Sequence, residues 1–403
     1  MNKMRKNDLF KSYRPKLLAT SIAAVCTSMI ATSVTQASDI DIYQQAKAGD
    51  ITLMMMLDIS TSMNGGGTAR TDLGLTSTDC SGSNTSSSSL PNYGYSRTYC
   101  TVSSSQFNTL STGNATNRAK AAKITQACNI QGNGSYFCGD RTARMKDAMY
   151  ELLNGSVTKG IAQLDDTKVV GLSTFGVRTN DNYAEGAILL PARALGEMIG
   201  TQTHRQLLTQ RVKGLNAITY TPTAYGYAEV INYIMGTRPD NNSLNRGFNN
   251  SDISTKTGTG TSQRYNMPGS LVQTNDTQEC SGQGIYVLTD GVPNSKHALT
   301  QNNMRIGLGD TSFSCNTSNN WDCQHKGARA LINKNNPLGL EVRTAVVGFG
   351  DLFETVTSFD RNKTQAENIA AIGGCTLNGG CDTDAKNAAH WGIVGGGGWY
   401  SGS

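Results

Sequence analysis

Short apolar segments of strand length alternate with helical segments along most of this chain. Strands are predicted at residues 51–57, 168–176, 186–192, 284–291 and 340–350. Helices are predicted around residues 117–127, 141–154, 204–215, 223–235, 325–335 and 365–374. Parallel strands that are buried on both faces need helices over each face. The alternation therefore predicts an α/β fold with a doubly wound, mostly parallel sheet flanked by helices.

The amino terminus predicts export from the cell. The first sixteen residues hold six basic residues and one acidic residue, which account for the whole net charge of +5. The apolar stretch "LLATSIAAVCTSMIATSV" follows and leads to Thr35-Gln36-Ala37, the pattern of a secretory signal peptide over residues 1–37. No other segment is predicted to cross a membrane. The remainder, residues 38–403, is near neutral and lacks a basic run, which argues against a nucleic-acid partner.

Export gives the cysteines a structural meaning, because disulfides persist in oxidising compartments. Ten cysteines are present, and Cys26 lies in the predicted signal peptide. Close spacing favours four pairs over zinc sites, namely Cys80 with Cys100, Cys128 with Cys138, Cys315 with Cys323, and Cys375 with Cys381. Cys280 is left over, so it either exchanges into another pairing or has a partner beyond residue 403.

Two polar stretches interrupt the alternation. Residues 64–140 and 237–280 are rich in Gly, Ser, Thr and Asn, which predicts long loop insertions, the first braced by two of the disulfides. The acidic stretch "DTDAKN" at 382–387 is interpreted as a polar turn, since it lacks the glycine and closing glutamate of a calcium loop. The Gly-rich end of the chain is expected to hold no final helix.

Oxygen-bearing side chains follow the strand at 51–57. Asp58, Ser60 and Ser62 alternate, so they point the same way in an extended segment. Thr221 precedes a predicted helix, and Asp290 ends another strand. Functional groups of such sheets lie outside the carboxyl ends of the strands. These five residues are therefore predicted to form a site for Mg²⁺ or Mn²⁺, with Ca²⁺ possible, because such cations take oxygen ligands.

The alternative readings of the same residues are weaker. A serine nucleophile would need a base, yet no histidine lies near these motifs in sequence, and there is no G-x-S-x-G. His204, His297, His325 and His390 lie in polar stretches and are expected to be solvated. A magnesium-dependent hydrolase using Asp58 remains a minor alternative. Taken singly, the motifs are also compatible with Asx turns, helix caps and ordinary turns. No catalytic residue is assigned, and the chain is not expected to be an enzyme.

The segments "LDISTSM", "TPTA" and "VLTDG", in this order, resemble the metal-ion-dependent adhesion site of von Willebrand factor A-type domains. This resemblance implies a doubly wound, Rossmann-like α/β domain over residues 38–403. It also implies one divalent cation held by Asp58, Ser60, Ser62, Thr221 and Asp290, with an acidic group of a partner completing its coordination.

A narrower resemblance covers the signal peptide, the Cys-bearing insertion, "LTDGVPN" and "WGIVGGGGWYSGS". Together these are similar to the amino-terminal part of type IV pilus tip adhesins of the PilC/PilY type. In that family a β-propeller domain follows; it is absent here, so the chain is expected to be truncated. The resemblance implies cell adhesion or pilus biogenesis at the cell surface, pilus tip or outer membrane. Partners would be an acidic group on a host, surface or pilus protein, and other pilus components.

The function predicted from the sequence is thus an exported adhesion module whose cation grips an acidic group of a partner. The alternative is a structural A-type domain that acts in pilus assembly and whose metal site is silent.

Overall fold

The computed structural model describes residues 51–64, 73–86, 92–178, 184–217, 220–240, 246–271, 282–294, 298–319 and 321–402. The predicted signal peptide, Cys26, Cys280 and His297 lie outside these residues. In the described part of the chain, no helix combines the length and the apolar character needed to cross a membrane.

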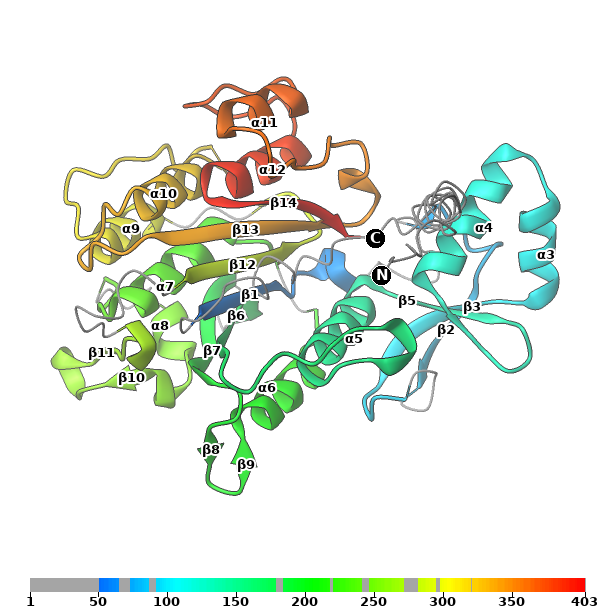
Figure 1. Cartoon of the computed structure of the whole chain (residues 1–403), viewed down its shortest axis with the longest axis horizontal. Coiled ribbons are helices and arrows are strands. Elements are labelled where there is room, and N and C mark those ends of the chain that lie inside the picture. The colour runs from blue at the N-terminus through cyan, green and yellow to red at the C-terminus, as the bar shows by residue number, and fades with distance from the viewer. Residues whose placement is uncertain are drawn as a thin grey trace, which may run out of the picture. The chain divides into compact units, whose positions relative to one another are not determined.

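A six-stranded sheet forms the centre of the molecule (Figure 1). Its order is β14-β13-β12-β1-β6-β7, and every neighbouring pair is parallel except β6 and β7. The strands are β1 (Thr52–Asp58), β6 (Val169–Arg178), β7 (Ala184–Ala194), β12 (Gln283–Thr289), β13 (Val342–Phe349) and β14 (Gly396–Gly402). The predicted mixed, mostly parallel α/β sheet is confirmed.

The chain reverses its direction of travel across the sheet at β1. It first adds β6 and β7 on one side of β1, and then returns to add β12, β13 and β14 on the other side. The loops that leave β1 and β12 therefore diverge at the same edge. In open α/β sheets, ligands bind in the crevice at such a switch point.

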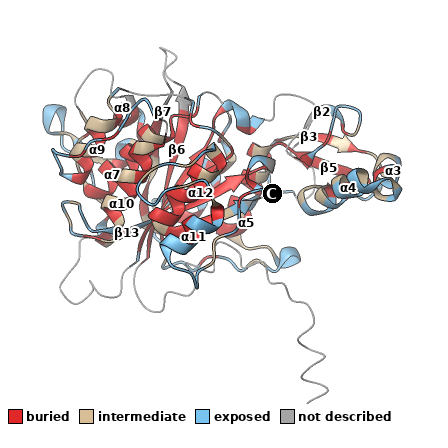
Figure 2. Ribbon diagram, turned by 90° about the horizontal axis from the view of Figure 1, so that it is seen from above, coloured by how far each residue is buried: buried red, intermediate tan, exposed pale blue. Residues whose placement is uncertain are grey.

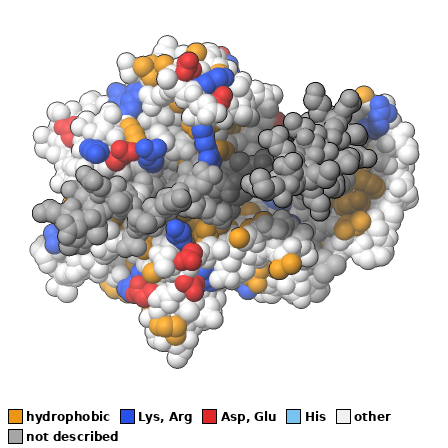
Figure 3. All heavy atoms as spheres, viewed as in Figure 1, with side chains coloured by type: hydrophobic (Ala, Val, Ile, Leu, Met, Phe, Trp, Pro, Cys, Tyr) orange, Lys and Arg blue, Asp and Glu red, His pale blue; other side chains and the backbone are white. Residues whose placement is uncertain are grey.

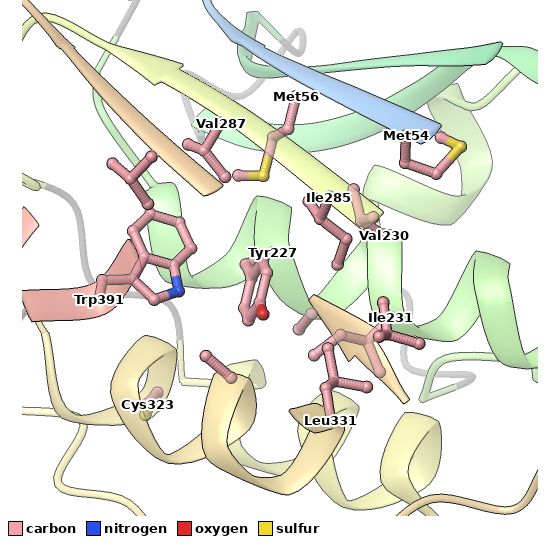
Figure 4. Packing of buried hydrophobic residues seen from close by; sticks show 14 of the residues in the cluster. Met54, Met56, Tyr227, Val230, Ile231, Ile285, Val287, Cys323, Leu331 and Trp391 are labelled. Atoms are coloured by element: carbon pink, nitrogen blue, oxygen red, sulfur yellow. The ribbon is translucent and has the colours of Figure 1, made fainter. Parts of the chain in front are cut away.

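The main core lies between the sheet and the helices α7 (Thr223–Met235), α9 (Thr300–Leu308), α10 (Asp322–Ile332) and α12 (Asp384–Val394). Figure 4 shows Met54 and Met56 of β1 directed toward Tyr227 and Val230 of α7. All seven residues of β1 are buried, as expected of a central parallel strand. Figure 2 shows the buried strands at the centre and the exposed residues on outer helices and loops.

Two glycines let α7 lie directly on β7. A Cβ atom at Gly186 would stand 2.2 Å from the Cα of Gly226, a distance that no side chain tolerates. Glycine in a strand commonly marks such a close approach of two backbones. This contact holds the start of α7, and with it the preceding Thr221 loop, against the sheet.

Helix α5 (Arg141–Asn154) begins at the N-cap Asp140, whose side chain accepts a hydrogen bond from the backbone N–H of Ala143, and ends at Gly155 with φ of 76°. Its apolar residues Met145, Met149, Leu152 and Leu153 are buried, whereas Ala148 is exposed. The polar residues Lys146, Asp147 and Glu151 are buried instead. Helix α6 (His204–Lys213) packs against α5.

The described part of the insertion at 64–140 is folded, so its interpretation as a surface loop is wrong for these residues; residues 65–72 and 87–91 lie outside the described residues. Its described part holds an antiparallel sheet in the order β2-β3-β5-β4, with its own apolar core. The elements are β2 (Ser81–Ser86), β3 (Arg97–Val102), α3 (Ser104–Thr112), α4 (Ala115–Ala127), β4 (Asn129–Ile130) and β5 (Tyr136–Gly139). The disulfides and a few large side chains form a small core, which could not be predicted from the polar composition of the segment.

This insertion docks on α5 through buried polar contacts. The Nε of Arg97 donates to the Asp147 carboxylate at 2.6 Å, and the hydroxyl of Tyr95 donates to the same oxygen. The hydroxyl of Tyr93 donates to Glu151 at 2.5 Å. These contacts explain why one polar stripe of α5 is buried.

The second insertion has less regular structure. Its described part contains α8 (Arg246–Asn250) and the short strands β10 (Lys256–Thr257) and β11 (Arg264–Tyr265). Its side chains Phe248, Tyr265 and Leu271 are buried in the main core. This insertion is thus packed on α7 and is not only a polar loop. The short strands β8 (Met198–Ile199) and β9 (Gln202–Thr203) form a separate hairpin before α6.

The carboxyl-terminal region differs from the prediction in two ways. The expected polar turn at 382–387 contains Thr383, which caps α12, and the first residues of that helix, so the described chain does hold a final helix. The Gly-rich segment that follows is the edge strand β14. A Cβ atom at Gly392 would stand 2.1 Å from the Gly398 carbonyl oxygen, so glycine is needed where α12 meets β14. Helix α11 (Gln365–Ile372) packs on α12.

All four predicted disulfides are present in the fold. Two lie in the first insertion, and the other two flank α10 and α12. Such bridges are typical of exported proteins. On the face shown in Figure 3, basic and acidic side chains are interspersed.

Candidate metal site

The candidate site lies at the carboxyl ends of β1 and β12, which are neighbours in the sheet (Figure 1). Leu57 pairs with Leu288, so the two strands end at nearly the same level and release Asp58 and Asp290 at the same edge. Both carboxylates are buried, at 0% and 3% exposure. The topology thus brings together two residues that are 232 positions apart in sequence.

The loop after β1 is shaped by its own side chains. The backbone N–H of Ser60 donates to Asp58 Oδ1 at 2.8 Å, and the N–H of Met63 donates to the Ser60 carbonyl at 3.1 Å. A 3₁₀ turn over Thr61–Asn64 follows. This Asx-type arrangement turns the chain immediately after the strand. The backbone N–H of Ile59 also donates a hydrogen bond to the Phe175 carbonyl of β6, which holds the loop over the neighbouring strand.

Hydrogen bonds join four of the five predicted ligands into one cluster. The Oγ atoms of Ser60 and Ser62 are 2.8 Å apart, and the Ser62 hydroxyl donates to Asp290 Oδ1 at 2.7 Å. The backbone N–H of Asp290 lies 3.4 Å from Asp58 Oδ2. Ser60 is buried, whereas Ser62 is exposed, so the cluster reaches the surface at Ser62.

The fifth predicted ligand, Thr221, is held beside this cluster by its backbone. The Thr221 N–H donates to Asn294 Oδ1 at 2.8 Å, and the Asn294 N–H donates to the Thr221 carbonyl at 3.3 Å. Asn294 follows Asp290 by four residues, so the two loops are tied together. Among the described residues, the hydrogen bonds that join the other four do not include the Thr221 side chain. Thr221 is 2% exposed.

Two carboxylates in one buried cluster perturb each other. Burial, followed by the like charge of Asp290, raises the pKa of Asp58 to about 7. Hydrogen bonds from Ser60 and Thr289 oppose this shift. The guanidinium of Arg141 forms an ion pair with Asp290, with 2.8 Å between Nη1 and Oδ2. A cation bound between the carboxylates would favour the ionised form of Asp58 and compete with Arg141 for Asp290.

The donor set fits a hard divalent cation. It consists of carboxylate and hydroxyl oxygens, which suit Mg²⁺, Mn²⁺ or Ca²⁺, and it contains no nitrogen or sulfur ligand of the kind that zinc prefers. Within the described ranges, no group of three or more His, Cys, Asp and Glu side chains is placed to hold a metal. This finding does not conflict with a site built from two carboxylates and three hydroxyls.

The described histidines are structural, and the expectation that they are solvated is wrong for all three. His204, His325 and His390 are at most 2% exposed. The Nε2 atoms of His204 and His325 lie 2.7 Å and 2.9 Å from backbone carbonyls of Val170 and Asn387. Burial lowers the pKa of His325 to about 3 and that of His390 to about 4, so both are neutral at physiological pH.

Three residues of the site were not predicted from the sequence. Thr289 donates its hydroxyl to Asp58 Oδ2 at 2.9 Å, and Asn294 holds the Thr221 loop. Thr289 is the first residue of "TDG" and Asn294 follows this motif by three residues, so proximity to Asp290 was an available signal. No signal in the sequence indicated Arg141, because 149 residues separate it from Asp290 and only the fold brings the two side chains together.

No protein-family model matches this chain, and no curated protein matches it either.

Proposed function

We propose that this chain is a cation-dependent binding module, in which one divalent cation at the edge of β1 and β12 grips an acidic group of a partner protein. The observation that supports this proposal most directly is the hydrogen-bonded cluster of Asp58, Ser60, Ser62 and Asp290. Such a constellation offers only oxygen ligands and reaches the surface at one point.

The residues of this chain have distinct roles in the proposal. Asp58 and Asp290 supply negative charge, Ser60 and Ser62 supply neutral oxygens, and Thr221 supplies a further hydroxyl from the loop before α7. Thr289 and the Ser60 backbone orient Asp58. With only two carboxylates, a bound divalent cation keeps an affinity for one more anionic oxygen, which a partner's Asp or Glu side chain provides.

The wider setting of the proposal is an adhesin of the type IV pilus, acting at the cell surface or pilus tip. It rests on the sequence resemblance to A-type domains of pilus tip adhesins, to which the four disulfides add compatibility with an exported protein. The proposed partner surface is acidic, and the proposal assigns no chemical reaction to the site.

Titration calorimetry of the metal-stripped, disulfide-bonded chain with Mg²⁺, Mn²⁺ and Ca²⁺ tests the first step. We expect one saturable site that is lost in Asp58→Asn and Asp290→Asn. Asparagine at 58 retains an oxygen for the Ser60 N–H, so the loop is expected to fold. Asp310→Asn, in an exposed turn, is the matched control and should bind as wild type does. Unchanged metal binding in both site variants would refute the proposed site.

One observation favours the alternative of a silent site. Arg141 already compensates the charge of Asp290, with side chains that are 16% and 0% exposed. If this ion pair persists in the presence of metal, the domain is structural. In that case, calorimetry would detect no binding in wild-type protein, and the thermal unfolding temperature would not respond to any of the three cations.

A further inference from the structure

A polar cavity of about 160 Å³ lies between α5 and the first insertion. Its wall includes Ser96 and Thr98 of the insertion, Asp140 and Lys146 of the α5 region, Asn64, and Asn216 after α6. None of the five predicted metal ligands contributes to this wall. We propose that the cavity binds a small protonated oxyanion such as inorganic phosphate. Lys146 would be its main cationic contact, and the Asp140 carboxylate would accept a hydrogen bond from the protonated oxygen of the anion.

The buried side chain of Lys146 is the main observation that supports a bound anion. It is 5% exposed and lies on the inner side of α5. Within the described part of the chain its ammonium group makes no hydrogen bond or ion pair, and it lies 5.8 Å from the centre of the Tyr95 ring. Burial lowers the pKa of Lys146, and the attraction of the Asp140 and Asp147 carboxylates offsets this shift only in part. Burying a cation without a hydrogen-bonded anionic partner is unfavourable, and an anion in the cavity would reduce this cost.

The rest of the wall suits an oxyanion. Hydroxyls of Ser96 and Thr98 and amides of Asn64 and Asn216 can donate hydrogen bonds. Arg97 also lines the cavity, and its Nε is committed to Asp147. Asp147, which does not line the cavity, accepts hydrogen bonds from Arg97 and Tyr95 that offset its charge. The volume of the cavity equals that of about five liquid water molecules, which is enough for one small anion.

Asp140 makes the cavity selective. Its Oδ1 accepts from the Ala143 N–H at 2.7 Å, at the start of α5. A second, unprotonated anion beside this carboxylate would be repelled. Phosphate retains a proton at neutral pH and can donate it in a hydrogen bond to the Asp140 carboxylate while accepting from Lys146. Sulfate carries no such proton, so phosphate should bind more tightly.

Phosphorus NMR line broadening and calorimetry with inorganic phosphate test the proposal on the full disulfide-bonded chain. A chelator is present throughout, so the result does not depend on cation binding at Asp58 and Asp290. We expect saturable binding of phosphate that weakens at least about tenfold in Lys146→Met and is partly restored in Lys146→Arg. Lys168→Met, a half-buried lysine before β6, is the matched control and should bind as wild type does.

The selectivity argument has its own variant. Asp140→Asn keeps a good N-cap for α5, so the fold is expected to be retained. This variant should lose the preference for phosphate over sulfate. Binding of phosphate that Lys146→Met leaves unchanged, or no saturation by phosphate in wild-type protein, would overturn the proposal. Equal binding of phosphate and sulfate by wild type would overturn the role of Asp140.

Discussion

At the scale of single residues, the candidate metal site is a balance of buried charges. Asp58 and Asp290 share one cluster, and each has a different source of compensation. Asp58 is held by hydrogen bonds from Ser60 and Thr289, whereas Asp290 is paired with Arg141. A cation bound at the proposed site would relieve repulsion between the carboxylates and compete with one guanidinium. We therefore expect the side chain of Arg141 to limit the affinity of the proposed site for a cation.

This competition predicts the effect of Arg141→Gln. Removing the guanidinium should increase the affinity for Mg²⁺ about tenfold, which is ~1.4 kcal/mol. The metal-free protein should lose about 1–3 kcal/mol of its free energy of unfolding, because Asp290 is left buried without its partner. Calorimetry and urea unfolding with and without Mg²⁺ measure the two effects. Arg361→Gln, on the surface, should change neither. A lower or unchanged metal affinity in Arg141→Gln would contradict the competition.

At the scale of elements, α7 is the helix that most closely couples the core to the site. Its start follows Thr221, its Gly226 touches β7, and its Glu229 lies fully buried beneath the second insertion. The hydroxyl of Tyr265 donates to Glu229 Oε2 at 2.7 Å. Burial raises the pKa of Glu229 to about 7 from a usual 4.5, with hydrogen bonds from Tyr265 and Tyr225 opposing the shift.

The raised pKa of Glu229 predicts a pH dependence of stability. Between about pH 4.5 and 7 the folded state binds a proton at Glu229 that the unfolded state has released. The free energy of unfolding should therefore fall as pH rises through this window, by on the order of 3 kcal/mol from this group. Urea unfolding with chelator at pH 5, 6, 7 and 8 measures the slope. Glu229→Gln should reduce the slope and leave the part that is due to Asp58, whose pKa is also raised to about 7, whereas the exposed Glu354→Gln should not change it. Identical slopes in all three proteins would refute the assignment.

At the scale of the whole molecule, the six-stranded sheet and the first insertion have separate apolar cores. They meet at α5, where Arg97, Tyr95 and Tyr93 contact Asp147 and Glu151. The insertion is small and carries two disulfides, as small domains with limited cores often do. Its stability should therefore depend on those bridges more strongly than that of the sheet.

Replacing both Cys80 and Cys100 with serine tests this division. A bridge that closes about 20 residues contributes roughly 3 kcal/mol, so the insertion should unfold locally while the sheet stays folded. Hydrogen exchange should show lost protection in β3 and β5 and retained protection in β1 and β12. Replacing Cys375 and Cys381 instead should leave β3 and β5 protected. Equal loss of protection throughout the chain would show a single cooperative unit.

The sequence by itself determined the alternation of strands and helices, because the apolar period of each segment follows from local geometry. It also indicated where Asp58 and Asp290 leave their strands, and it favoured four disulfides between cysteines that lie close in sequence, a pairing that the structure established. Each of these features depends on residues that are near one another along the chain.

Only the tertiary structure decided the features that depend on distant partners. The Arg141–Asp290 pair, the buried Lys146 and Glu229, and the buried histidines all occur where polar sequence meets the rest of the fold. The folded insertion and the Gly-rich strand β14 were missed for the same reason. The polar composition of a segment indicates only that it can be exposed to water. Whether the segment folds depends on disulfides, aromatic contacts and close backbone packing with other segments.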